Sequence, residues 1–349
     1  ANINPLGPSQ RGLDAINDQL RYISHYPDAT NDDVLNAIAD TYGMDKNQII
    51  VGNGAAELLY AICRLPGYTG AFVPAPGFSE YKEALEASNI PVRDIFYRPR
   101  EDDNGKPYFE VPYLALETFA AELKGQDGRI IVFLGNPNNP DGTLLDKAHI
   151  RTVASMLKDA NSLLVIDESF IDFVSNEPLR DNDQSMRSLI NEFDNIIVVH
   201  SFTKFYAVPG LRIGAAFGNE KLISHLHQYI PSWSVNTLAQ AYTEAALNDV
   251  DYIKRTKQEL NEERSFMYNA LDAIEGITVY PPSANFILFK VNHDGITANT
   301  INENLKKYNM IVRNCDSYVG LNNQWVRIAI KDHDTNIKLV EKLTDILKV

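Results

Sequence analysis

The stretch VVHSFTKFYAVPGLRIGAAFG, residues 198–218, places a lysine where two apolar strands converge. Its first residues complete a β-branched run, and IGAAFG, residues 213–218, has the composition of a second buried strand. Between the two runs lie Lys204 and, eight residues later, Arg212. Packing alone does not explain a lysine at this point, so we treat Lys204 as a candidate functional residue.

Three near-continuous apolar runs dominate the first half of the chain: RIIVFLG (129–135), SLLVIDE (162–168) and NIIVVHS (195–201). Continuous apolar character is typical of strands that are covered on both faces, which predicts a mostly parallel sheet. The segment 146–160 between the first two runs has apolar residues at a helical period, namely Ile150, Val153, Ala154 and Leu157. This pattern predicts a βαβ unit and an α/β fold.

Ligands of such sheets bind outside the carboxyl ends of the strands. The polar clusters GNPNNPDG, DESF and SFTK follow the three predicted strands directly. We therefore expect the site at this edge of the sheet.

The length and the later pattern indicate more than one domain. A chain of 349 residues is long for a single domain. Beyond Asn236 long charged helical segments appear, followed by the short strands NFILFKV and WVRIAI. The sequence predicts an N-terminal arm (1–30), a large cofactor-binding domain (31–240) and a smaller α/β C-terminal domain (241–349).

Charge, hydropathy and the cysteine and histidine content limit the partners and the compartment that we expect. A net charge of −14 argues against nucleic acid, and no apolar run approaches the roughly 18 residues that span a bilayer. Two cysteines, Cys63 and Cys315, favour a reducing compartment, so we expect the cytoplasm. The closest histidines, His225 and His227, do not share a helix face, so no metal is expected. Because the chain begins at Ala1, an upstream segment is expected to have been removed.

Three clusters remain ambiguous when each is taken alone. VGNGAAELLYAI (51–62) is either a tight turn or a helix start that binds phosphate, and Glu57 stands where a dinucleotide fingerprint has its third glycine. GNPNNPDG (135–142) is a loop with more amides than a turn requires. Asp167 and Glu168 either cap a helix or, if buried, need a cationic partner.

Taken together, the clusters fit pyridoxal phosphate. This cofactor needs an amine for its aldehyde, an acid for its ring nitrogen, a donor for its 3-oxygen and an anion site for its phosphate. Lys204 supplies the amine, and Asp167 keeps the ring nitrogen protonated so that the ring accepts electrons.

Along essentially its whole length the chain resembles fold-type I pyridoxal-phosphate enzymes of the histidinol-phosphate aminotransferase group, and most of all the threonine-phosphate decarboxylases of cobalamin biosynthesis. The motifs that carry this resemblance are NPLGPS (4–9), YPDA (26–29), GNPNNPDG, DESFIDF (167–173) and SFTKFYAVPGLRIG (201–214).

The resemblance implies a role for each matching residue. The cofactor phosphate is held by the backbone amides of Gly54, Ala55 and Ala56 and by the side chains of Ser201, Thr203 and Arg212. Phe78, in PAPGFSEY (74–81), stacks on the ring, and Asn139 bonds the 3-oxygen. Tyr26 reaches the cofactor phosphate of a neighbouring subunit, which implies a homodimer with shared active sites.

Three features favour the decarboxylase over the aminotransferase. Phe170 stands where the aminotransferases usually have a tyrosine, and the segment around the lysine, KFYAVPGLRIG, resembles the decarboxylase sequence. The segment 312–336 resembles the decarboxylase segment with two arginines, Arg313 and Arg327. Arginine's fork geometry suits Arg327 to a carboxylate and Arg313 to a phosphate. A histidinol-phosphate aminotransferase must also bind glutamate, so two arginines fit both enzymes.

The expected substrate is thus a small phosphorylated amino acid, bound by Arg313, Arg327, Asn139 and, near the start of the chain, Asn2. In the decarboxylases a histidine-containing segment preceding ANINPLG contacts substrate, and Asn2 is the residue of this chain nearest to it.

Overall fold

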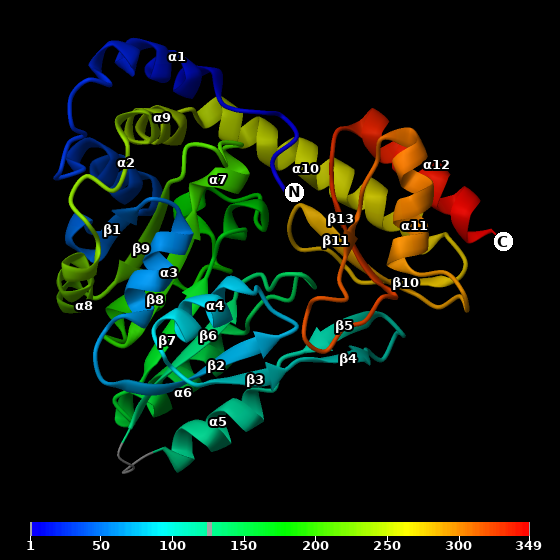
Figure 1. Ribbon diagram of the computed structural model, residues 1–349, viewed down its shortest axis with the longest axis horizontal. Helices are drawn as coiled ribbons and strands as arrows, with labels where there is room; N and C mark the ends of the chain where they lie inside the picture. Colours follow the sequence, from blue (N-terminus) through cyan, green and yellow to red (C-terminus); the bar gives the residue numbers. More distant parts are fainter. Residues whose placement is uncertain (1, 124–127, 349) are drawn as a thin grey trace.

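The computed structural model describes residues 2–123 and 128–348 (Figure 1). Its central element is a seven-stranded sheet with the order β1-β9-β8-β7-β6-β2-β3. These strands are β1 (Ile49–Gly52), β2 (Tyr68–Ala75), β3 (Val92–Phe96), β6 (Arg129–Gly135), β7 (Leu163–Asp167), β8 (Ile196–Ser201) and β9 (Gly214–Gly218). Strand β9 runs antiparallel to both of its neighbours, and the other pairs are parallel. The prediction of a mostly parallel sheet is confirmed.

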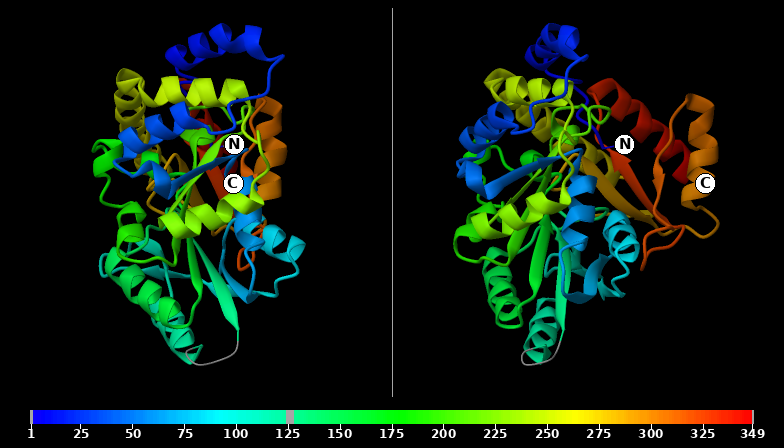
Figure 2. Two further views of the ribbon diagram at one scale, coloured as in Figure 1. Left: turned by 90° about the vertical axis from the view of Figure 1, so that its left-hand side faces the viewer. Right: turned by 60° about the vertical axis from the view of Figure 1, so that its left-hand side comes forward.

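The three apolar runs form β6, β7 and β8 as expected, because they are buried on both faces. Successive residues alternate between two apolar clusters: Ile131 packs in one, and Val132 packs in the other. Helices cover both faces of the sheet (Figure 2). The α-helices are α1 (Gln10–Gln19), α2 (Asp32–Tyr42), α3 (Ala55–Cys63), α4 (Glu80–Ala87), α5 (Tyr113–Glu122), α6 (Lys147–Asp159), α7 (Phe202–Phe205), α8 (Glu220–Leu226), α9 (Thr237–Leu247), α10 (Val250–Asp272), α11 (Ala298–Leu305) and α12 (His333–Leu347).

A second sheet has four antiparallel strands in the order β10-β11-β13-β12. They are β10 (Ile277–Val279), β11 (Phe286–Val291), β12 (Arg313–Asn314) and β13 (Trp325–Ala329). The long helix α10 runs from the neighbourhood of α9 to this sheet, and α12 packs against α10 and α11 (Figure 1). A separate hairpin consists of β4 (Arg98–Glu101) and β5 (Pro107–Glu110).

The predicted domain boundary between residues 240 and 241 falls inside α9, which packs against α1 and α2. The division into an arm, a large domain and a small domain stays a prediction. The start of the chain is anchored at the site: the backbone N–H of Asn4 donates to the carbonyl of Lys204 at 3.0 Å, and its side-chain amide donates to the carbonyl of Phe205 at 2.8 Å.

Among the described residues, no helix combines the length and the apolar character needed to cross a membrane.

Candidate active site

The parallel pairing of β6, β7 and β8 brings the predicted site residues to one edge of the sheet. Asp167 is the last residue of β7, and it lies beside Gly135 of β6 and Val199 of β8. The chain leaves β8 at Ser201 and enters the short helix α7, which carries Lys204. Residues far apart in sequence therefore meet at the carboxyl ends of adjacent strands, as expected for this class of sheet.

Lys204 is half-buried, and its Nζ donates to the Oγ of Ser201 at 2.9 Å. Burial lowers the pKa of Lys204 below its ordinary value; the carboxylate of Asp167 opposes this effect, and the guanidinium of Arg212 adds to it. A lowered pKa increases the neutral fraction of the amine, and only the neutral amine attacks an aldehyde.

Two adjacent carboxylates at this strand end have opposite environments. Glu168 is fully buried and is satisfied by Arg187 at 3.4 Å and by the Oγ of Ser185 at 2.6 Å. Asp167 is also buried, but among the described residues its carboxylate accepts only from neutral donors, the hydroxyl of Tyr81 and the backbone N–H of Ser169, both at 2.8 Å. Within the described chain no cation forms an ion pair with Asp167, so a protonated ring nitrogen suits it as partner. Tyr81 lies in a quoted motif but had no role in the sequence prediction.

The start of α3 forms an anion cradle. Gly54 has a φ of 83° and precedes Ala55 and Ala56, the first helical residues, and no side chain caps the helix. A Cβ at Gly54 would lie 2.5 Å from a terminal nitrogen of Arg212, so only glycine lets the guanidinium come this close. The backbone N–H of Gly54, predicted to bind the phosphate, instead donates to the carbonyl of Gly52 at 2.7 Å. The N–H groups at the helix start, from Ala55 and Ala56, together with the Arg212 guanidinium, suit a phosphate.

Ser201 and Thr203, the remaining predicted phosphate ligands, come from the end of β8 and the start of α7. The hydroxyls of Ser201 and Thr203 are 2.8 Å apart and buried, and the Oγ of Ser201 also accepts a hydrogen bond from the Lys204 amine. Glu57 accepts from the backbone N–H of Asn53 at 2.6 Å, which gives it a local role in shaping the turn.

Asn139 and Phe78 line the adjoining cleft. The Oδ1 of Asn139 accepts from the hydroxyl of Tyr318 at 3.2 Å and from a terminal nitrogen of Arg327. The ring of Phe78 packs edge-on against that of Tyr81, with centroids 5.6 Å apart. Tyr318, like Tyr81, was not predicted.

The two arginines singled out by the sequence stand directly opposite one another on β12 and β13. Arg313 is exposed and donates to the Oγ of Ser317 at 2.8 Å. The Nε of Arg327 is buried and has no hydrogen-bond partner, and neither guanidinium forms an ion pair, within residues 2–123 and 128–348. Like charges opposite one another are unfavourable in a sheet, so this arrangement suits an anionic ligand.

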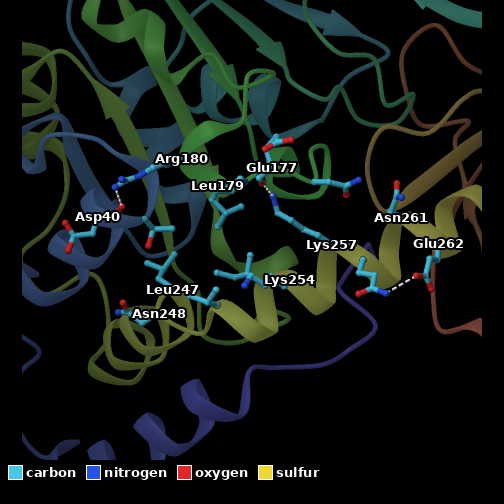
Figure 3. Close-up of a pocket in the computed structure, with 16 residues that line it drawn as sticks. Asp40, Glu177, Leu179, Arg180, Leu247, Asn248, Lys254, Lys257, Asn261 and Glu262 are labelled. Carbon is cyan, nitrogen blue, oxygen red and sulfur yellow. Dashed lines mark hydrogen bonds between the residues drawn. The ribbon is translucent and has the colours of Figure 1, made fainter.

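A cleft of about 1170 Å³ brings these groups together. Four predicted residues line it: Phe78, Asn139, Arg313 and Arg327. A separate cavity of about 800 Å³ lies between α10 and the loop that carries Leu179 and Arg180 (Figure 3). None of the predicted site residues lines that cavity.

Two predicted residues lie outside this cluster of contacts. Tyr26 is 80% exposed, and its ring packs against Trp233, with centroids 4.8 Å apart, so within one chain it does not reach the cradle. Asn2 is buried and lies two residues before Asn4, whose backbone bonds to Lys204.

This fold, with a half-buried lysine, a buried carboxylate that pairs with no cation among the described residues, and an anion cradle at one sheet edge, is that of the pyridoxal-phosphate enzymes of fold type I. Residues 1–343 match the family described as aminotransferase class I and II. The chain belongs to this family, and its cofactor is pyridoxal 5'-phosphate.

Relatives with two different activities are similar to the chain. An adenosylcobalamin biosynthesis bifunctional protein of Leptospira interrogans is 32% identical over 99% of this chain and 38% of its own length. The threonine-phosphate decarboxylase of Salmonella typhimurium is 31% identical over 99% of this chain and 90% of its own. The histidinol-phosphate aminotransferase of Methanothermobacter thermautotrophicus is 30% identical over 100% and 88% of the two chains.

Solved structures show the same fold. The histidinol-phosphate aminotransferase of Clostridium acetobutylicum superposes with a TM-score of 0.87 at 26% identity, covering 99% of this chain and 97% of the other. The enzyme of the same name from Sinorhizobium meliloti, solved in complex with pyridoxal-5'-phosphate, gives a TM-score of 0.83 at 22% identity, covering 100% and 89%.

Proposed function

We propose that the protein decarboxylates L-threonine O-3-phosphate to (R)-1-amino-2-propanol O-2-phosphate in cobalamin biosynthesis. The observation that carries this proposal is the opposed pair of Arg313 and Arg327 at the cleft, with the buried Nε of Arg327 left without a partner. Phosphothreonine carries a carboxylate and a phosphate, one anion for each guanidinium. Bidentate pairing with both ends would fix the substrate in one orientation.

The residues around the cradle would hold the cofactor. Its phosphate would bind the N–H groups of Ala55 and Ala56 at the start of α3 together with Ser201, Thr203 and Arg212, and Phe78 would lie against its ring. Asp167 would keep the ring nitrogen protonated, and Asn139 would donate to the ring oxygen. When bound, the cofactor supplies an electron sink for a bond broken at the substrate Cα.

Lys204 would first hold the cofactor covalently and then, as a released amine, hold or deliver a proton at the substrate Cα. In decarboxylation the bond between Cα and the carboxylate carbon breaks, carbon dioxide leaves and a proton takes its place. Arg327 would hold the carboxylate in the orientation that breaks, and Arg313 would hold the phosphate. No acceptor keto acid takes part.

Phe170 also supports decarboxylation. Its ring packs against Phe286, with centroids 5.1 Å apart, and lies 5.6 Å from the Nζ of Lys204. It brings no hydroxyl to the position where the aminotransferases of this group usually have one.

The second candidate is histidinol-phosphate aminotransferase. The relatives with this name reach 30% identity, nearly that of the decarboxylases, and two arginines also suit glutamate. In that reaction the Cα hydrogen, and not the carboxylate, would be lost.

The deciding experiment uses two reactions. The purified holoenzyme is incubated with phosphothreonine alone, and separately with histidinol phosphate and 2-oxoglutarate. We expect carbon dioxide and aminopropanol phosphate from the first reaction and no glutamate from the second. Glutamate in the second reaction, with no carbon dioxide in the first, would identify the aminotransferase and refute our proposal. Homodimer formation and a cytoplasmic location also remain proposals.

A further inference from the structure

Tyr318 contacts three of the proposed site residues, Asn139, Arg313 and Arg327, but has no role in the function proposed above. It occupies the turn between β12 and β13, where its backbone N–H donates to the carbonyl of Cys315 at 3.1 Å and its carbonyl accepts from Leu321 at 3.0 Å. Its hydroxyl accepts from a terminal nitrogen of Arg327 at 2.9 Å and donates to the Oδ1 of Asn139 at 3.2 Å. The guanidinium of Arg313 lies 5.7 Å from its ring centroid.

These contacts determine which way the amide of Asn139 faces. A guanidinium has only donors, so the atom of Asn139 nearest Arg327 must be the acceptor Oδ1. The hydroxyl of Tyr318 bonds to the same oxygen. With Oδ1 held by these donors, the Nδ2 of Asn139 is left as the donor at the opposite edge of the planar amide group.

We propose that Tyr318 is a positioning residue: together with Arg327 it locks the Asn139 amide so that Nδ2 donates to the ring oxygen of the cofactor. This inference rests on the role proposed above for Asn139. Phe170 has no hydroxyl with which to bond the ring oxygen. Residues of the second sheet would instead act on that oxygen indirectly, by holding the amide of Asn139 that donates to it. The same contacts would also link the state of the cofactor to Arg327, the group proposed to bind the substrate carboxylate.

The expected effect has a definite sign. Asn139, as a neutral donor, would stabilise negative charge on the ring oxygen of the bound cofactor, and it would do so most when no proton lies near that oxygen. Asn139 should therefore lower the pH at which the absorbance of the bound cofactor changes, and a poorly held amide should lower it less.

The experiment is a spectrophotometric pH titration of the substrate-free holoenzyme. Tyr318→Phe removes only the hydroxyl, Asn139→Ala removes the donor, and a double variant combines them. Tyr308→Phe is the matched control, because Tyr308 is 50% exposed in the same part of the chain and lines no part of the cleft. We expect the midpoint to rise in Tyr318→Phe by about half a pH unit, the effect of one neutral hydrogen bond, and to rise further in Asn139→Ala. The control should titrate like the wild type.

The double variant tests whether Tyr318 acts through Asn139. We expect its midpoint to equal that of Asn139→Ala, since the hydroxyl has nothing left to position. An unchanged midpoint in Tyr318→Phe, or a shift that simply adds to that of Asn139→Ala, would overturn the inference. If Asn139→Ala itself leaves the midpoint unchanged, the role proposed for Asn139 fails, and the inference fails with it. The titration uses no substrate, so its result is independent of which reaction the enzyme performs.

Discussion

At the scale of single residues, the environment of Lys204 is what fits it for covalent chemistry. Burial lowers its pKa, and the nearby Arg212 acts in the same direction. When cofactor is added to the cofactor-free protein, the rate of covalent bond formation should rise with pH, because the neutral amine is the nucleophile. The midpoint of this pH–rate curve should lie below 10.5, the ordinary pKa of a lysine. A stopped-flow series across pH measures this midpoint; a value at or above that of an ordinary lysine would contradict it.

Lys204→Ala should abolish turnover and the visible absorbance of the bound cofactor while leaving the fold intact, because the amine makes the covalent link. Borohydride reduction followed by peptide mapping should place the label on Lys204 alone. Lys254→Ala is the matched control, since Lys254 is exposed on α10 and lines the other cavity. Label on any other lysine of the wild type would rule out the assignment.

Asp167→Asn should retain cofactor but lower kcat by about 100-fold or more, because a neutral amide cannot hold the proton on the ring nitrogen. The variant keeps the shape of the side chain, so the hydrogen bond from Tyr81 has an acceptor oxygen available. Cofactor content by absorbance and kcat from initial rates measure the two effects separately. Near-normal turnover in a variant with full cofactor content would exclude the role.

At the scale of elements, the opposed arginines on β12 and β13 predict different kinetic effects. Arg313→Ala should raise KM for phosphothreonine by about 10- to 100-fold with a smaller change in kcat, because it removes a charge-assisted contact to the phosphate. Arg327→Ala should also lower kcat, because the carboxylate would no longer be held in the breaking position. Arg313→Lys keeps the charge without the fork and should fall between wild type and Arg313→Ala. Equal effects of the two alanine variants on kcat would contradict this division of roles.

The same pair should cost the ligand-free protein some stability. Because like charges directly opposite in a sheet repel, Arg313→Ala should have a Tm no lower than the wild type in low-salt, phosphate-free buffer. Adding phosphothreonine should raise the wild-type Tm more than that of the variant. A lower Tm of the ligand-free variant would mean that Arg313 has a structural role instead.

The sequence could predict those elements whose burial produces a pattern within their own residues. The apolar runs of β6, β7 and β8 and the helical period around Ile150 predict a parallel sheet with its site at the carboxyl edge, because each pattern reflects burial within its own element. The antiparallel direction of β9 is not encoded in its apolar run, since burial on two faces is the same for either direction.

The contacts of Tyr81 and Tyr318 could not be predicted from the sequence, for a different reason. Tyr81 comes from α4 to Asp167 on β7, and Tyr318 comes from the second sheet to Asn139 after β6. Such contacts depend on how elements are placed in space, and neither a buried tyrosine in a helix nor a half-buried one in a turn has a distinguishing local pattern. Glu168 and Asp167 show the same limit: they are adjacent in sequence and both buried, yet among the described residues a cation pairs with Glu168 and none pairs with Asp167.

At the scale of the whole molecule, exposed apolar residues between 20 and 26, together with Trp233, bear on assembly. The residues Leu20, Tyr22, Ile23, Tyr26 and Trp233 are all more than 40% exposed, and the rings of Tyr26 and Trp233 are in contact. Exposed clusters of this kind commonly mark protein interfaces. These residues suit the proposed homodimer, in which Tyr26 would reach the cofactor phosphate of the partner subunit.

Shared sites can be tested by mixing inactive subunits. Lys204→Ala and Tyr26→Ala homodimers would each have two defective sites, but a mixed dimer would have one site with Lys204 and Tyr26 both intact. After subunit exchange, random pairing should restore about a quarter of wild-type activity, provided that Tyr26→Ala alone is inactive. Mixing Lys204→Ala subunits with the double variant Lys204→Ala, Tyr26→Ala is the control, because no pairing then gives a whole site. An active monomer in sedimentation velocity would refute the shared site, and so would a failure to recover activity when mixed dimers are demonstrably present.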